Sequence, residues 1–122
     1  MARNKRSEGR VYEDAVASAM EKKKYRILEK NFFANRTEID IIAAKGDTVV
    51  FVEVKARKEG SGFNPLEAVG RVKQRRIITA AKKYINSKRL FKNYVRFDVA
   101  GVIFSGDKIV KLDLVQDAFQ DG

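Results

Sequence analysis

Two stretches of the chain decide its fold: Thr37-Glu38-Ile39-Asp40-Ile41-Ile42-Ala43 and Thr48-Val49-Val50-Phe51-Val52-Glu53-Val54-Lys55. Both are rich in β-branched residues, and Lys45-Gly46-Asp47 lies between them, a combination typical of a β-hairpin. If Gly46 and Asp47 are the central turn residues, Asp40 lies opposite Glu53 and Glu38 lies opposite Lys55. The strands are expected to be apolar near the turn and charged at the far end.

The segments around this hairpin predict a mixture of helices and strands in a single α/β domain, residues 1–122. Apolar residues recur at helical spacing over 9–24, and the segment 64–86 opens with Asn64 and Pro65, which are typical of a helix start. Gly70 is a candidate interruption of the second helix. The remaining expected elements are strands at 25–33, 94–104 and 108–112 and a short helix in the tail, 113–122.

The composition fits one globular domain and restricts the available chemistry. The chain has 122 residues, 44% hydrophobic residues, and no histidine or cysteine. It therefore cannot build a Ser-His-Asp triad, a cysteine nucleophile or an ordinary zinc site. The basic start, Met1 to Arg10, is not followed by an apolar stretch, and no apolar run is long enough for a membrane span, so a cytoplasmic protein without membrane attachment is expected.

The positive charge is concentrated in one segment. The net charge is +10, and residues 55–96 contain 13 Lys and Arg against two Asp and Glu. A basic block of this size is typical of a phosphate-binding surface on a nucleic-acid-binding protein. The alternative is a solvated surface that aids solubility or binds polyanions without specificity.

The charged end of the predicted hairpin is a candidate metal site. A surface pair between Glu38 and Lys55 explains those two residues, because such pairs are common on solvated strand ends. It does not explain Asp40 opposite Glu53, since like charges across a strand pair are destabilising unless a cation lies between them. Asp40 and Glu53 are therefore the predicted ligands of Mg²⁺ or Mn²⁺, which prefer carboxylate oxygens.

The ordered set of motifs resembles a known family. The acid at Asp40, followed by the Glu53-x-Lys55 pattern on the next strand, looks like the signature of the PD-(D/E)xK nuclease superfamily. More narrowly, the chain is similar to the YraN-like bacterial proteins, which are related to Holliday-junction resolvases. Thr37 and Tyr12 depart from the family pattern, which has glycine before the acid. Further matching positions, from the first helix to the fourth strand, are Gly9, Glu13, Tyr25 to Leu28, Asn31, Glu67 to Val69, Lys73, Gln74 and Arg96 to Asp98.

The resemblance implies a restriction-endonuclease-like fold, with a mixed β-sheet core flanked by helices, and a role for each candidate catalytic residue. Asp40 and Glu53 would hold the metal, and Lys55 would stabilise the developing charge or orient the attacking water. Glu13 resembles the N-terminal helix acid of resolvase-like members and would complete the outer shell of the site. Gln74 would reach the site from the long helix as an orienting hydrogen-bonding group. Glu13 and Gln74 could equally be ordinary helix residues.

The implied function is hydrolysis of phosphodiester bonds by a structure-selective DNA endonuclease, with branched or single-stranded DNA among the substrates. The alternative is a nucleic-acid-binding scaffold that does not cleave and that serves repair, recombination or uptake. Few aromatic residues are expected on the surface, because most fit the periodicity of the core. Resolvase-like relatives act as dimers, so a homodimer is an option by analogy. The residues expected to contact phosphates are Arg57, Lys58, Arg71, Lys73, Arg75 and Arg76.

Overall fold

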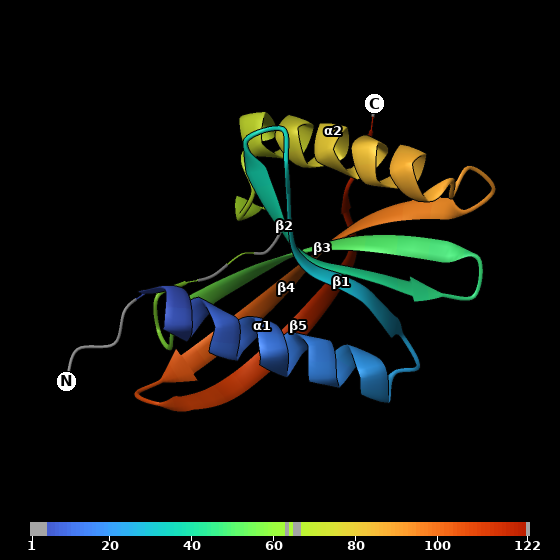
Figure 1. Ribbon diagram of the computed structural model, residues 1–122. Coiled ribbons are helices and arrows are strands. Elements are labelled where there is room, and N and C mark those ends of the chain that lie inside the picture. The colour runs from blue at the N-terminus through green and yellow to red at the C-terminus, as the bar shows by residue number, and fades with distance from the viewer. Residues whose placement is uncertain (1–4, 63, 65–66, 122) are drawn as a thin grey trace.

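The chain folds into one five-stranded sheet with a helix on each face. The computed structural model describes residues 5–62, 64 and 67–121, and for residues 5–9 it describes the backbone alone. Figure 1 shows α2 above the sheet and α1 below it. The elements follow one another as α1 Lys5–Lys22, β1 Arg26–Ala34, β2 Thr37–Lys45, β3 Thr48–Lys58, α2 Arg71–Lys88, β4 Tyr94–Ser105 and β5 Lys108–Phe119.

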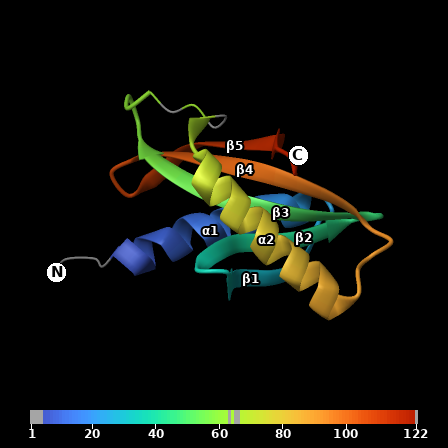
Figure 2. The same cartoon turned by 90° about the horizontal axis from the view of Figure 1, so that it is seen from above.

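The sheet is mixed, and its strands lie in chain order. Neighbours in the order β1-β2-β3-β4-β5 are antiparallel except β3 and β4, which are parallel. A parallel pair cannot be joined by a tight turn, and α2 provides the long crossover between its two strands. Figure 2, seen from above, shows α2 crossing obliquely over this part of the sheet. The expected mixed sheet flanked by helices is confirmed.

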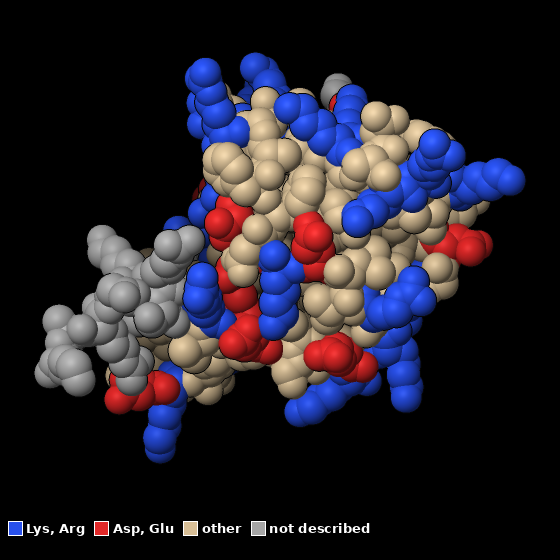
Figure 3. Space-filling view, viewed as in Figure 1, with Lys and Arg blue, Asp and Glu red and all other residues tan. Residues whose placement is uncertain are grey.

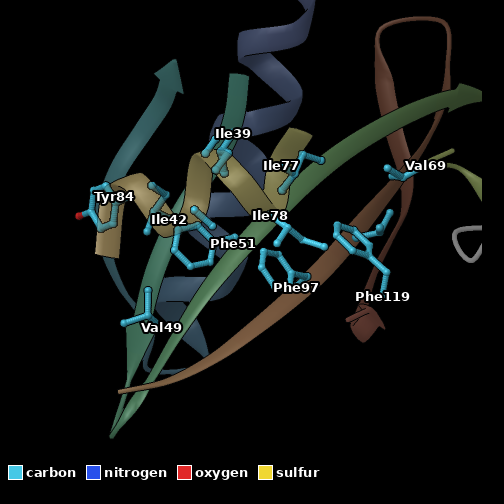
Figure 4. Packing of buried hydrophobic residues seen from close by; sticks show 13 residues of the cluster. Ile39, Ile42, Val49, Phe51, Val69, Ile77, Ile78, Tyr84, Phe97 and Phe119 are labelled. Atoms are coloured by element: carbon cyan, nitrogen blue, oxygen red, sulfur yellow. The ribbon is translucent and has the colours of Figure 1, made fainter. Parts of the chain in front are cut away.

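Two apolar layers hold the helices to the sheet. On the α2 face, Phe51 stacks against Phe97 and meets the ring of Tyr84 edge-on (Figure 4). On the α1 face, Val16 and Met20 pack against residues of β2, β3 and β4. Burying one large aliphatic or aromatic side chain stabilises the fold by about 1.5–3 kcal/mol. These layers therefore hold each helix against its face of the sheet.

The predicted hairpin register is correct near the turn and wrong at the charged end. Ile41 pairs with Val52 and Lys45 pairs with Thr48, as expected, but the ladder ends at Ile41 and Val52. Beyond that point the Asp40 carboxylate, not a backbone carbonyl, accepts the Val54 N–H at 2.8 Å. The expected cross-strand pairs of Asp40 with Glu53 and of Glu38 with Lys55 are therefore absent from this ladder.

The alternation of β2 side chains also breaks at Asp40. An unbroken strand would place Ile39 on the same face as Ile41. In the structure Ile39 packs in the α2 layer with Ile42, whereas Ile41 packs in the α1 layer. This change of phase lies where β2 separates from β3.

Two other expectations were wrong at element boundaries. The second helix begins at Arg71 and not at Asn64. Gly70, the expected interruption, is the N-cap of this helix. Asn64 instead accepts the Glu67 N–H through its carbonyl, and Pro65 lies outside the described residues. The tail is not a short helix, because β5 continues as a strand to Phe119, whose ring stacks on Phe97 of β4. In the described part of the chain, no helix combines the length and apolar character that crossing a membrane requires.

Candidate functional site

Three carboxylates from two elements meet where β2 and β3 separate. Glu13 comes from the middle of α1, and Glu38 and Asp40 come from the start of β2. Each of the three offers an oxygen that lies within 4.8 Å of the others. Glu13 is buried, Asp40 is half-buried and Glu38 is exposed, so the cluster opens toward solvent on one side. We call Glu13, Glu38 and Asp40 the acidic cluster.

Asn31 of β1 holds two members of this cluster together. Its Nδ2 donates to Glu13 Oε1 at 2.7 Å and Oε2 at 3.1 Å, and to Glu38 Oε1 at 2.8 Å. The backbone of Asn31 has φ +55°, a left-handed conformation that asparagine tolerates better than most residues. The conformation of one residue therefore directs an amide donor at two carboxylates.

Glu53 of β3 lies beside the cluster, and two lysines lie near its carboxylate. Its carboxylate is 5% exposed; Oε1 accepts from Lys73 Nζ at 2.6 Å and lies 3.7 Å from Lys55 Nζ. Burial lowers the pKa of Lys55, against the effect of the Glu53 charge. For Lys73, burial alone would lower the pKa, but the hydrogen bond and charge of Glu53 raise it. Lys73 is thus held as an ammonium.

Two acids of the site, Asp40 and Glu13, hold protons more strongly than free carboxylates do. Burial and, next in size, the negative charge of Glu53 raise the pKa of Asp40 to about 8, although the Val54 N–H acts to lower it. Burial also raises the pKa of Glu13, and its hydrogen bond from Asn31 opposes that shift. Without a compensating cation, the site therefore keeps at least one carboxyl group protonated near neutral pH.

The donor set fits a hard divalent cation. Every candidate ligand is a carboxylate, the class of donor that Mg²⁺ and Mn²⁺ prefer. Glu53 Oε2 is buried and, among the described residues, has no hydrogen-bond partner. A buried acceptor without a partner costs roughly 1–3 kcal/mol, and more when it is charged. A buried carboxylate oxygen without such a partner, beside a cluster of acids, fits the binding of a divalent cation.

Gln74 makes its side-chain hydrogen bond to the backbone just before α2. Its Nε2 donates to the Val69 carbonyl at 2.8 Å, which ties the first turn of α2 to the segment before it. No hydrogen bond of the described residues joins Gln74 to Asp40 or Glu53. Its place in the structure is that of a residue that stabilises the start of α2.

The predicted phosphate-binding residues differ in how accessible they are. Five are exposed, and Arg57 also donates from Nη1 to the Ala56 carbonyl at 2.8 Å. Lys73 does not join them, because Glu53 holds its ammonium. Figure 3 shows acidic residues gathered between the two helices, with lysines and arginines along α2 above them. The exposed members are Arg57, Lys58, Arg71, Arg75 and Arg76.

Sequence reasoning did not anticipate Asn31 or Lys73 as partners of the acids. Asparagine is depleted in strands, so its occurrence inside β1 was a usable signal. Lys73 gave no such signal, since its contact with Glu53 depends on how α2 packs over the sheet. Glu38 was expected to be a structural residue, either paired with Lys55 or exposed; it is exposed, and it also belongs to the acidic cluster.

Comparisons with known proteins place the whole chain in one family. Residues 12–102 match the family described as "Uncharacterised protein family UPF0102". A UPF0102 protein of Clostridium perfringens strain 13 is 46% identical over 121 residues, covering 98% of this chain and 99% of the relative. A UPF0102 protein of Desulforapulum autotrophicum is 38% identical over 120 residues, with 98% of each chain covered. The protein therefore belongs to the UPF0102 family.

Proposed function

We propose that this protein is a Mg²⁺- or Mn²⁺-dependent endonuclease that hydrolyses phosphodiester bonds in structured DNA. The observation that carries the proposal is the acidic cluster beside Glu53, whose buried Oε2 has no partner among the described residues. The resemblance of Asp40, Glu53 and Lys55 to the PD-(D/E)xK signature supports the same activity. The exposed arginines of α2 supply the charge that a phosphate backbone requires.

Each residue of the candidate site would supply one of the functions that phosphodiester hydrolysis requires. Asp40 and Glu53 would hold the cation, with Glu13 and Glu38 next to them. The bound cation would polarise the phosphate and lower the pKa of the attacking water. Lys55, on the same strand as Glu53, would donate to the phosphate oxygens as negative charge develops on them. Asn31 would keep the Glu13 and Glu38 carboxylates in place.

A nucleic-acid-binding scaffold that does not cleave is the second candidate. Lys73 favours it, because its ammonium 2.6 Å from Glu53 already compensates this carboxylate without a metal. The two functions make different demands on Lys73. A nuclease needs the ammonium to move or to share Glu53 with the cation, whereas a scaffold can keep the ion pair permanently.

Cleavage of a labelled panel tests the nuclease. The panel contains a four-way junction, a flap, a single strand, a duplex and an RNA, each with Mg²⁺ or Mn²⁺ and each with EDTA. We expect cutting by the wild type and by the exposed-lysine control Lys92→Ala, and none by Lys55→Ala or in EDTA. Binding without metal-dependent cutting of any substrate would favour the scaffold.

Calorimetry with Mn²⁺ tests the metal site separately from cleavage. Glu53→Gln removes one charge and keeps the shape of the side chain, so Mn²⁺ affinity should fall at least tenfold. Glu67→Gln, an exposed acid ahead of α2, is the matched control and should bind as the wild type does. Equal Mn²⁺ affinity in both variants would exclude Glu53 as a ligand.

A further inference from the structure

An open groove lies next to the acidic cluster and is lined mainly by basic and apolar side chains. Its volume is about 690 Å³, within the range of roughly 300–1,000 Å³ typical of ligand clefts. It runs between the β1–β2 turn and the first turns of α2, which are tied together where Asn35 Nδ2 donates to the Arg76 carbonyl at 3.4 Å. Glu38 and Lys73 also line the groove, so it leads directly to the candidate site.

The groove combines positive charge with exposed apolar surface. Arg36, Arg71 and Arg76 line it, and all three are exposed. Phe33 and Val72 line it as well, with 70% and 61% of their surfaces exposed. The expectation that aromatic residues belong to the core is thus wrong for Phe33, although its neighbour Phe32 does pack on Tyr84.

Strand pairing fixes how far Phe33 lies from the acids. Phe33 of β1 is the ladder partner of Glu38 of β2. Directly opposed residues in antiparallel strands have Cβ atoms about 5 Å apart. The side chain of Phe33 is therefore a direct neighbour of the Glu38 side chain, which belongs to the acidic cluster. A group that stacks on Phe33 therefore brings whatever is attached to it to the edge of the site.

We propose that this groove binds an unpaired DNA strand, with one base stacked on Phe33 and the adjoining phosphates on Arg36, Arg71 and Arg76. A base has an accessible face only outside a duplex, whereas arginines alone would accept phosphates from either form. The combination therefore selects a single strand or the unpaired arm of a branched molecule. The inference rests on the proposed function for the type of ligand, and it adds the residue that determines specificity.

Tryptophan fluorescence can observe the stacking directly, because the chain contains no tryptophan. Phe33→Trp introduces a single reporter in the groove. Phe91→Trp is the matched control, since Phe91 is 67% exposed and follows the other end of α2. In EDTA, titration with a single-stranded oligo(dT) should quench the Phe33→Trp reporter strongly, and a duplex of equal length should not. The Phe91→Trp reporter should change little with either ligand.

Affinity provides the second readout, also in EDTA. Phe33→Leu keeps an apolar side chain and removes the aromatic face, so binding of labelled oligo(dT) should weaken about tenfold. Duplex binding should stay unchanged, and Phe91→Leu should match the wild type on both ligands. Circular dichroism spectra would verify that each variant is folded.

These outcomes separate the groove from the nuclease, since neither titration requires metal or cleavage. Equal quenching of the two reporters, equal quenching by duplex, or unchanged oligo(dT) affinity in Phe33→Leu would overturn the groove proposal. Metal-dependent cutting of duplex would still support the nuclease in that case. Strand-specific quenching without any cutting would support the groove and count against catalysis.

Discussion

Asp40 gives the metal-free protein an unusual dependence of stability on pH. Its pKa is about 8 in the folded chain, raised mainly by burial and by the charge of Glu53, against about 4 when the chain is unfolded. A raised folded-state pKa means that the folded protein holds the proton more tightly. The contribution to stability is complete below pH 4 and is lost as the pH rises toward 8.

The Asp40→Asn variant should remove most of this dependence. Asparagine keeps an oxygen that can accept the Val54 N–H and cannot lose a proton in this range. In urea denaturation with EDTA, the wild type should therefore lose more stability between pH 5.5 and pH 8 than Asp40→Asn does. Asp113→Asn, a more exposed acid of β5, should behave as the wild type does. A pH dependence that is unchanged in Asp40→Asn would refute the assigned proton.

The amide of Asn31 makes a second prediction at the scale of single residues. Asn31→Asp replaces a donor to Glu13 and Glu38 with a third negative charge beside them. The metal-free protein should lose about 2 kcal/mol of stability, the usual order for a hydrogen bond to a charged group. Asn31→Gly is the control for the added charge, because glycine accepts φ +55°, removes the same donor and adds no charge, so it should lose less stability.

Mg²⁺ distinguishes the two Asn31 variants. A cation at the acidic cluster screens the added carboxylate, so Mg²⁺ should raise the thermal midpoint of Asn31→Asp more than that of Asn31→Gly. Differential scanning fluorimetry with and without Mg²⁺ makes this measurement. The same Mg²⁺ response in both variants would mean that no cation binds near Asn31.

At the scale of elements, the end of α2 carries a residue that strains the backbone. Arg89 follows the helix with φ 55°, and the Leu90 N–H returns to the Ile85 carbonyl at 3.0 Å. A left-handed residue after a helix favours glycine. Arg89→Gly should therefore raise the free energy of unfolding by about 0.5–1 kcal/mol.

Lys88→Gly is the control for this prediction. Lys88 is the last residue of α2 and has helical geometry, so glycine there should lower the free energy of unfolding by up to about 1 kcal/mol. Urea denaturation of both variants tests the opposite signs. A loss of stability in both would show that the arginine side chain matters more than the backbone strain.

Sequence patterns predicted the elements better than their ends. The β2–β3 hairpin was predicted because the β-branched runs and the turn act locally. The ladder could not be followed to Asp40, because the Val54 N–H is taken by a side chain. The predicted start of α2 was wrong because Asn64 and Pro65 resemble a helix cap in the sequence, whereas the helix begins at Arg71.

The same limit applies to the site. Asp40, Glu53 and Lys55 could be proposed from two adjacent strands, because the short turn between them brings the strands together. Lys73 and Asn31 could not, since their contacts depend on how α2 and β1 pack against these strands. Phe33 was missed for a similar reason: period-two alternation suggests which side of a strand a residue faces but not whether another element covers that side.

At the scale of the whole molecule, the question is whether the net charge of +10 acts as a diffuse field or through a local surface. A diffuse field predicts that removing any lysine or arginine weakens DNA binding to a similar extent. A local surface predicts that only the lysines and arginines in contact with phosphates contribute to DNA affinity. Each such contact releases about 0.9 counterions from a duplex. The exposed arginines in the first turns of α2, beside the acidic cluster, favour the local surface.

Neutralising these arginines one at a time decides between the two. Arg71→Gln, Arg75→Gln and Arg76→Gln should each make the slope of log K against log salt concentration shallower by about one on duplex DNA. Lys92→Gln, beyond the other end of α2, changes the net charge equally and should leave the slope unchanged. Anisotropy titrations at several salt concentrations in EDTA provide the slopes. The same small change in all four variants would show that the positive charge attracts DNA as a diffuse field, and that the phosphate-binding surface does not lie on α2.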